Sequence, residues 1–196
     1  MNHTTTGIIK WLLLLLGGFS ASAQDLQKIH PDTFYVTDKN EIAIEALRQP
    51  GIVYRDEKLK EYPTKFWIEG NIYFSGSARE TDALYVFGID SAGSPEFWAA
   101  GYSLNQKHIL LYKIAIGEGG EIRLIELAKK PVEIIDHRNQ NVYRIIFIHQ
   151  TNEIKIEVNG VPLLTKCPLP TKEITYYGYL VKGKLARFEK MRVNGE

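Results

Sequence analysis

The chain contains a single cysteine, Cys167, among its 196 residues. An intramolecular disulfide is therefore excluded, and stability has to come from a buried hydrophobic core rather than from covalent cross-links. The sequence also lacks clusters of cysteine and histidine at the spacing of a zinc site. Cys167 lies in the stretch LLTKCPLPT, with no histidine nearby in sequence, so we expect it to pack rather than to react.

An excess of charge of either sign is also missing. The 24 basic and 23 acidic side chains give a formal net charge of +1, and Lys10 is the only charged residue before residue 24. A balanced chain has no electrostatic footprint for DNA, RNA or anionic lipid. We therefore expect no nucleic-acid partner. A glycine-rich phosphate loop is absent too, because the stretch AIGEGGEI has no lysine and no helix after it.

The first residues have the composition of an export signal. Lys10 supplies a positive charge, residues 11–16 are an apolar run too short to span a bilayer, and Ala21-Ser22-Ala23 resembles a cleavage site. We expect residues 1–23 to be a signal peptide cleaved near Ala23. The remaining residues, 24–196, are long enough for one domain with a sizeable core, and we expect that domain to be secreted or periplasmic, without a membrane anchor.

No segment keeps a helical apolar period. Short segments rich in Ile, Val, Tyr, Phe and Trp alternate instead with period two, and Gly, Asn, Asp and Pro separate them. This pattern predicts one all-β domain built as an antiparallel sandwich or barrel. The predicted strands are Glu41–Leu47, Lys65–Phe74, Ala83–Ile89, Glu96–Leu104, His108–Ile116, Ile122–Leu127, Val142–His149, Glu153–Val158, Ile174–Val181 and Leu185–Val193.

Two local features add detail to this pattern. In EIKIEVNGVPLL the apolar side chains of residues 154, 156 and 158 should face inward, and Asn159-Gly160 is the strongest short signal for a β-hairpin. In ARFEKMRV the apolar residues change parity, which predicts a β-bulge near Glu189-Lys190.

Several of these stretches, in this order, resemble one known superfamily. VYRIIFIHQTNEIKIEVNGVPLL, YYGYL and KLARFEKMRV resemble the closing strands of concanavalin A-like lectin/glucanase domains, which include laminin G-like and 3-keto-disaccharide hydrolase-type domains. ALYVFGID, FWAAGYSL and HILLYKIAIGEGGEIRLIEL resemble the middle strands. The resemblance runs from about Lys65 to Val193. It implies a two-sheet jelly roll with a concave face, in an exported and bacterial protein, and a function in glycan binding, glycoside cleavage or adhesion.

The catalytic signature of that superfamily is absent. Its retaining glucanases place two carboxylates about 5–5.5 Å apart. The string that supplies them, Glu-x-Asp-x-Glu or Glu-x-Asp-x-x-Glu, does not occur here. The pairs Glu41/Glu45 and Glu153/Glu157 lack the intervening Asp, so we expect them on solvated charged faces. The 3-keto-disaccharide hydrolase subgroup carries an Asn-Ser-Gly-Ile strand followed by Arg, where this chain reads ALYVFGID. We assign no catalytic residue, and we predict no metal or cofactor.

Aromatic residues give the strongest functional signal. Sugars stack on aromatic rings through their C–H surfaces, while amides and carboxylates bind the hydroxyl groups. Trp98 and Tyr102 share one strand face, with only Ala100 between them. We therefore predict non-catalytic binding of a carbohydrate on the concave face, by Trp98, Tyr102 and Trp67 with Asp90, Glu96 and Gln106. The alternatives are a glycoside hydrolase of the 3-keto-disaccharide hydrolase type, and a structural or protein-interaction module whose concave face is filled by its own side chains or by another protomer.

Overall fold

A computed structural model of the chain describes residues 26–56, 65–75, 80–132, 141–148, 151–166 and 174–195. The predicted signal peptide and Cys167 lie outside these residues. The described chain is all-β, as predicted, and none of it forms a helix that could span a membrane. Its strands are β1 (Gln27–Ile29), β2 (Thr33–Val36), β3 (Ile42–Asp56), β4 (Lys65–Phe74), β5 (Asp82–Ser91), β6 (Ser94–Ser103), β7 (His108–Ile116), β8 (Ile122–Pro131), β9 (Asn141–Ile148), β10 (Glu153–Val158), β11 (Val161–Lys166), β12 (Tyr176–Phe188) and β13 (Arg192–Gly195).

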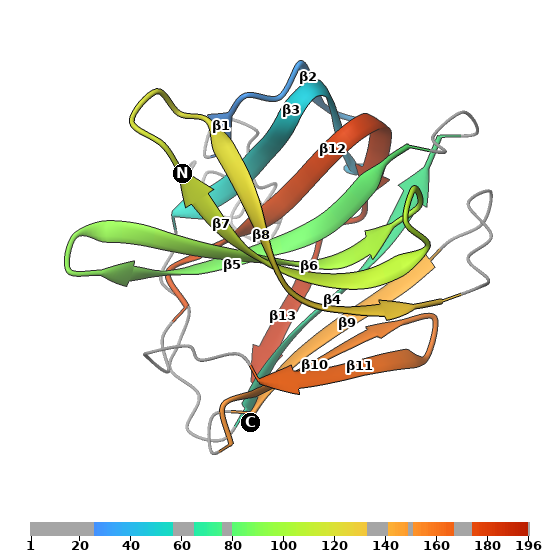
Figure 1. Cartoon of the computed structure of the whole chain (residues 1–196). Coiled ribbons are helices and arrows are strands. Elements are labelled where there is room, and N and C mark those ends of the chain that lie inside the picture. The colour runs from blue at the N-terminus through green and yellow to red at the C-terminus, as the bar shows by residue number, and fades with distance from the viewer. Residues whose placement is uncertain are drawn as a thin grey trace, which may run out of the picture.

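The strands form two antiparallel layers (Figure 1). The first layer has the order β1-β3-β12-β5-β6-β7-β8. The second has the order β2-β3-β12-β4-β9-β10-β11, and β13 pairs with β4 beside the end of β12. In Figure 1 the orange strands β9, β10 and β11 lie below the green strands β5, β6 and β7. Every pairing is antiparallel, as expected for a sandwich in which hairpins join neighbouring strands.

Two long strands, β3 and β12, pass from one layer to the other. The first half of β12 pairs with residues 51–56 of β3, and its last residues pair with residues 42–44. The register between the two strands shifts on either side of Gly183. This residue has a φ of 109°, which glycine adopts without strain but other residues do not. Irregular pairing at such a corner lets a strand change sheets. The bend therefore lies at Gly183. At the predicted bulge near Glu189-Lys190 the strand is interrupted, between the end of β12 at Phe188 and the start of β13 at Arg192.

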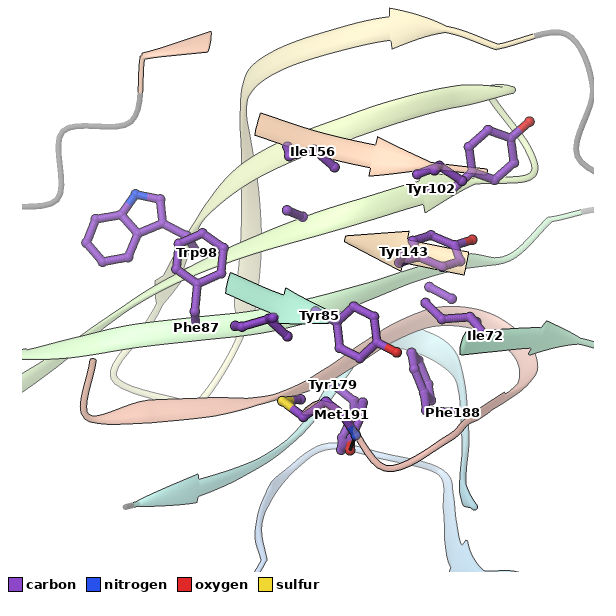
Figure 2. Packing of buried hydrophobic residues seen from close by; sticks show 14 of the residues in the cluster. Ile72, Tyr85, Phe87, Trp98, Tyr102, Tyr143, Ile156, Tyr179, Phe188 and Met191 are labelled. Atoms are coloured by element: carbon purple, nitrogen blue, oxygen red, sulfur yellow. Dashed lines mark hydrogen bonds between the residues drawn. The ribbon is translucent and has the colours of Figure 1, made fainter. Parts of the chain in front are cut away.

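A hydrophobic core fills the space between the layers (Figure 2). The first layer contributes Tyr85, Phe87 and other side chains of odd number on β5, and the second contributes Ile154, Ile156 and Val158 of β10. These three residues of β10 are fully buried while their neighbours are half-exposed, which confirms the predicted alternation. The second layer thus has one face toward the core and one toward solvent.

The first layer is buried on both faces. Along β5 the odd-numbered side chains enter the core between the layers, and the even-numbered Leu84 and Val86 enter a second cluster on the outer face. Ile52 of β3 and Ile122 of β8 belong to this second cluster. Strands β3 and β8 also contact each other, although four strands separate them in the layer. The first layer therefore curls, and its outer face is concave.

The hairpin predicted at Asn159-Gly160 is confirmed. Both residues have positive φ, 49° and 80°, and they join β10 to β11 with Val158 opposite Val161. The Asn159 side-chain oxygen accepts a hydrogen bond from the Val142 amide at 2.8 Å. The turn is thus a corner held against the start of β9, and its polar groups are used within the fold.

Two tyrosine hydroxyl groups are buried in the core without a hydrogen-bond partner among the described residues. They belong to Tyr85 and Tyr143, whose rings lie edge to face with centroids 6.2 Å apart. Burial raises the pKa of both phenols well above 10. An unpaired buried hydroxyl costs about 1–3 kcal/mol of stability.

We therefore expect Tyr143→Phe to raise the free energy of unfolding by about 1 kcal/mol, because it deletes an unpaired hydroxyl and leaves the ring. Urea denaturation followed by circular dichroism measures this change. Tyr179→Phe is the matched control. The Tyr179 hydroxyl accepts a hydrogen bond from the Met191 amide at 3.3 Å. Removal of this hydroxyl should therefore lower the free energy of unfolding by about 1 kcal/mol. A Tyr143→Phe protein less stable than wild type would contradict the prediction.

Candidate functional site

The two rings predicted to bind sugar lie inside the core between the layers. Trp98 is 3% exposed and Tyr102 is 2% exposed. Trp98 is stacked on Phe87 at an interplanar angle of 9°, with ring centroids 6.2 Å apart. The Tyr102 hydroxyl donates a hydrogen bond to the Val132 carbonyl at 3.3 Å. The two residues do share a strand face, but in this arrangement neither ring offers a free surface to a ligand (Figure 2).

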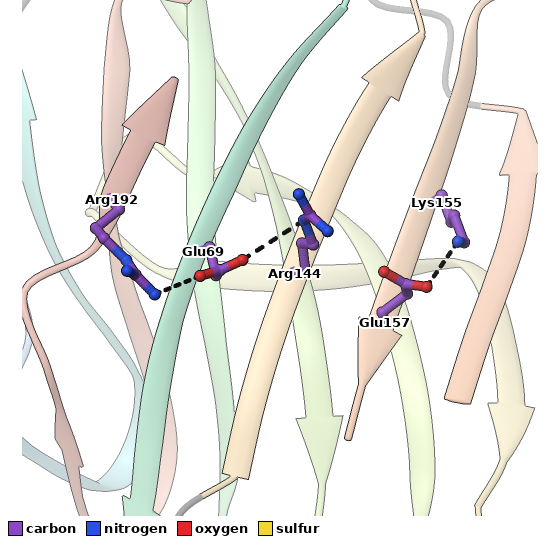
Figure 3. Close-up of polar contacts among 5 residues, drawn as sticks. All are labelled: Glu69, Arg144, Lys155, Glu157 and Arg192. Atoms are coloured by element: carbon purple, nitrogen blue, oxygen red, sulfur yellow. Dashed lines mark hydrogen bonds and ion pairs between the residues drawn. The ribbon is translucent and has the colours of Figure 1, made fainter. Parts of the chain in front are cut away.

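Trp67 lies on the far side of the molecule, on the solvent face of the second layer. It is half-buried, and the guanidinium of Arg144 lies 5.3 Å from its ring centroid. Figure 3 shows Glu69 between Arg144 and Arg192, and it is ion-paired with both. The charges on this face are mutually paired, and Trp67 does not lie on one surface with Trp98 and Tyr102.

The three predicted polar residues are dispersed. Asp90 is exposed at the end of β5 and accepts a hydrogen bond from the Gly93 amide at 2.9 Å. Glu96 forms an ion pair with Lys113 at 2.9 Å, and the hydrogen bond from Lys113 is the main cause that lowers the pKa of Glu96. Gln106 is exposed in the turn between β6 and β7, at the opposite end of the layer from Asp90.

The middle of the concave face is closed by its own side chains. Leu84, Val86, Ala99, Leu110 and Leu180 have no exposed surface. They belong to the second hydrophobic cluster, against which residues of β1, β3, β8 and β12 pack. A sugar chain therefore cannot lie along the centre of this face in the conformation described, and exposed groups occur only toward its ends.

One end of the concave face holds a polar group that is closed to solvent. Asp82 is 5% exposed, and Ser103 opposite it on β6 is fully buried. Burial raises the pKa of Asp82, while a hydrogen bond with Ser103 and the charge of Lys182 act in the other direction. Ser103 also accepts a hydrogen bond from the Gln106 amide at 3.0 Å. These contacts fix the turn between β6 and β7.

The other end carries two half-exposed tyrosines side by side, Tyr54 of β3 and Tyr176 of β12. Their rings meet edge to face with centroids 5.9 Å apart. Both rings pack on Phe97 of β6, at 5.1 Å and 5.2 Å, and Phe97 is only 1% exposed. A buried ring thus supports two partly exposed ones, which is the arrangement of a rigid aromatic surface.

Glycines on the neighbouring strands make room for these rings. Gly178 pairs with Tyr54, and Gly88 pairs with both Tyr176 and Phe97. A Cβ atom at Gly88 would lie 2.8 Å from the Phe97 ring, and one at Gly178 would lie 2.8 Å from the Tyr54 Cβ. Because these positions have no side chain, the aromatic rings can lie across the adjacent strands.

Polar side chains surround the two tyrosines. Gln27 on β1 is paired with Tyr54, and Asp56 on β3 is paired with Tyr176. Asp90 lies two residues beyond Gly88, on the other side of Tyr176. The pKa of Tyr176 is raised by burial first and then by the charges of Asp56 and Asp90. We call these five residues, Gln27, Tyr54, Asp56, Asp90 and Tyr176, the Tyr54–Tyr176 surface.

Three of the four carboxylates considered for catalysis are ion-paired with a cation. Glu153 is ion-paired with Lys166 at 3.3 Å. Glu157 is ion-paired with Lys155 at 2.6 Å (Figure 3). Glu41 is 8% exposed rather than solvated, because it is ion-paired with Arg187 at 3.2 Å. Within the described residues, no group of three or more His, Cys, Asp or Glu side chains is placed to hold a metal ion.

Sequence reasoning did not find Tyr54 or Tyr176. Tyr54 follows Pro50-Gly51, which ended the predicted strand at Leu47, whereas β3 continues to Asp56. Tyr176 opens the stretch YYGYL, in which it shares a face with Gly178. An aromatic residue two positions from a strand glycine is the signal that could have indicated it, since such a glycine leaves space beside a ring.

No protein-family model and no curated protein sequence matches this chain. Solved structures do match it over most of its length. A carbohydrate-binding module, CBM66 from Bacillus subtilis, has 13% identity and a TM-score of 0.63 over 87% of this chain and 96% of that one. The carbohydrate recognition domain of Emp46p has 12% identity and a TM-score of 0.59 over 88% and 90%. Basic winged bean lectin has 8% identity and a TM-score of 0.59 over 87% and 92%.

These likenesses establish the fold. The chain has the concanavalin A-like jelly-roll architecture that its sequence resembles, with two stacked antiparallel layers. At such low identity the comparisons carry no residue role across, so a functional site has to be argued from the side chains of this chain.

Proposed function

We propose that the protein is an exported, non-catalytic carbohydrate-binding domain that binds glycan at the Tyr54–Tyr176 surface. The domain comprises residues 24–196 and follows a signal peptide of residues 1–23. It uses no metal or cofactor. The observation that carries the proposal is the pair of half-exposed tyrosine rings, supported from below by buried Phe97 and bordered by an amide and two carboxylates.

This arrangement suits a sugar for two physical reasons. The rings of Tyr54 and Tyr176 are held by aromatic contacts and by strand pairing, so little side-chain entropy is lost when a pyranose ring stacks on them. Gln27, Asp56 and Asp90 supply donor and acceptor groups to sugar hydroxyls at the edge of the rings. The three similar structures named above are a carbohydrate-binding module, a carbohydrate recognition domain and a lectin, which supports the same class of ligand.

A glycan array followed by affinity electrophoresis in polysaccharide gels tests the proposal. We expect wild-type protein to bind at least one neutral glycan, and Tyr176→Ala to weaken that binding about tenfold, since loss of one aromatic contact of about 1.4 kcal/mol changes Kd by that factor. Tyr35→Ala is the matched control, because Tyr35 is also exposed but lies on β2. Equal affinity in wild type and Tyr176→Ala would overturn the site.

A structural or protein-interaction module is the second candidate. One observation favours it, namely that the centre of the concave face is filled by residues such as Leu84, Val86 and Leu180. The same array separates the two candidates. A folded wild-type protein that binds none of the glycans favours the interaction module and removes the carbohydrate proposal.

A further inference from the structure

The Tyr54–Tyr176 surface carries two carboxylates and no described cation of its own. Asp56 and Asp90 are both exposed, one on each side of Tyr176. Among the described residues neither forms an ion pair. Asp56 also lies close enough to Tyr54 to add to the effect of burial in raising the pKa of that phenol. A ligand on the two rings would therefore lie within range of two negative charges.

The basic residues of the same strands point elsewhere. Lys28 alternates with Gln27 along β1, and its ammonium group lies 4.5 Å from the ring centroid of Phe34. Arg55 lies between Tyr54 and Asp56 on β3, so its side chain leaves the opposite face of the strand. Lys182 is on the concave face, but it pairs with Asp82 at the far end of the layer. These cations do not neutralise Asp56 and Asp90.

We infer that the Tyr54–Tyr176 surface selects glycans by charge, so that neutral polysaccharides bind and polysaccharides carrying carboxylate or sulfate groups are excluded. This inference rests on the proposed function and specifies its ligand class. The physical cause is repulsion between Asp56 or Asp90 and an acidic group on the sugar, since none of the described cations of these strands lies where it would pair with that group. Discrimination against the wrong partner by like charge is a general route to specificity.

Matched pairs of polymers test the inference. Biolayer interferometry on the immobilised full domain compares dextran, pullulan and hydroxyethyl cellulose with carboxymethyl-dextran, carboxymethyl-pullulan and carboxymethyl cellulose. At 50 mM salt we expect each neutral polymer that binds to do so at least tenfold more tightly than its acidic partner. Raising the salt concentration to 500 mM should bring the ratio of neutral to acidic affinity closer to one, because salt screens exposed charges.

The variant Asp56→Asn/Asp90→Asn should bring the ratio of neutral to acidic affinity close to one, and this ratio is measured within the variant because both side chains also border the bound sugar. Asp38→Asn/Glu80→Gln removes two exposed carboxylates from other loops and is the matched control, with an unchanged ratio. An acidic polymer that binds wild type as tightly as its neutral partner overturns the charge inference and leaves the proposed function standing. If folded wild-type protein binds none of the six polymers and no glycan on the array, both the charge inference and the proposed function are overturned.

Discussion

Replacement of Trp98 by alanine is expected to lower the free energy of unfolding by about 3–5 kcal/mol. The indole is 3% exposed, and it is stacked on Phe87 within the core between the layers. Truncation to a methyl group removes that contact and leaves a cavity that the two layers cannot close, since β6 is fixed on both sides by hydrogen bonds to β5 and β7. Guanidinium denaturation followed by circular dichroism measures the loss.

Two further variants make this result specific. Trp98→Phe keeps a ring against Phe87 and should cost much less, so it remains folded and can be assayed for glycan binding, which we expect to match wild type. Trp67→Ala removes a half-buried indole from the solvent face of the second layer, and we expect a loss of roughly 1 kcal/mol or less. A Trp98→Ala protein with near wild-type stability and no glycan binding would instead restore Trp98 as a ligand contact.

The positions of most strands could be predicted because the alternation of apolar residues is strong. The prediction for β4, Lys65–Phe74, agrees with the structure at both ends, and the Asn159-Gly160 corner needed only local turn chemistry. The long strands were harder. Pro50-Gly51 marks a place where β3 bends between layers rather than ends, and β12 combines two predicted strands across the corner at Gly183.

Strand β11, Val161–Lys166, was also missed. Its only inward residue that is buried is Leu163, and Pro162 beside it lacks an amide proton. Proline is tolerated there because β11 is at the edge of its layer, where it pairs with β10 alone. An edge strand with one buried residue carries too little alternation to be identified from sequence.

The site was less predictable than the fold, for a physical reason that β6 illustrates. Trp98, Ala100 and Tyr102 share one face and Phe97 and Ala99 share the other, and both faces are apolar. Period-two alternation tells which side chains lie together, but it cannot tell which face meets solvent when both are apolar. That choice depends on the curl of the whole first layer, which arises from contacts between distant strands.

Gly178→Ala is expected to lower the free energy of unfolding by about 3 kcal/mol, at the upper end for overpacking. A Cβ atom at this position would lie 2.1 Å from the Val53 carbonyl oxygen and 2.5 Å from the Tyr54 Cα. Both are backbone atoms of β3, so the clash is relieved only if β3 moves away from β12. Because Tyr54 moves with β3, the variant should also weaken glycan binding, in addition to its loss of stability.

Gly160→Ala is the matched control for this prediction. Gly160 has a φ of 80°, but no atom lies within 4 Å of a Cβ placed there. The control therefore carries only the strain of a left-handed backbone, about 1–2 kcal/mol, and should leave glycan binding unchanged. If the two alanine variants lose equal stability in urea denaturation, contact between β12 and β3 is not what requires glycine at residue 178. The packing account of the Tyr54–Tyr176 surface would then be wrong, since the same close approach of the two strands brings the rings together.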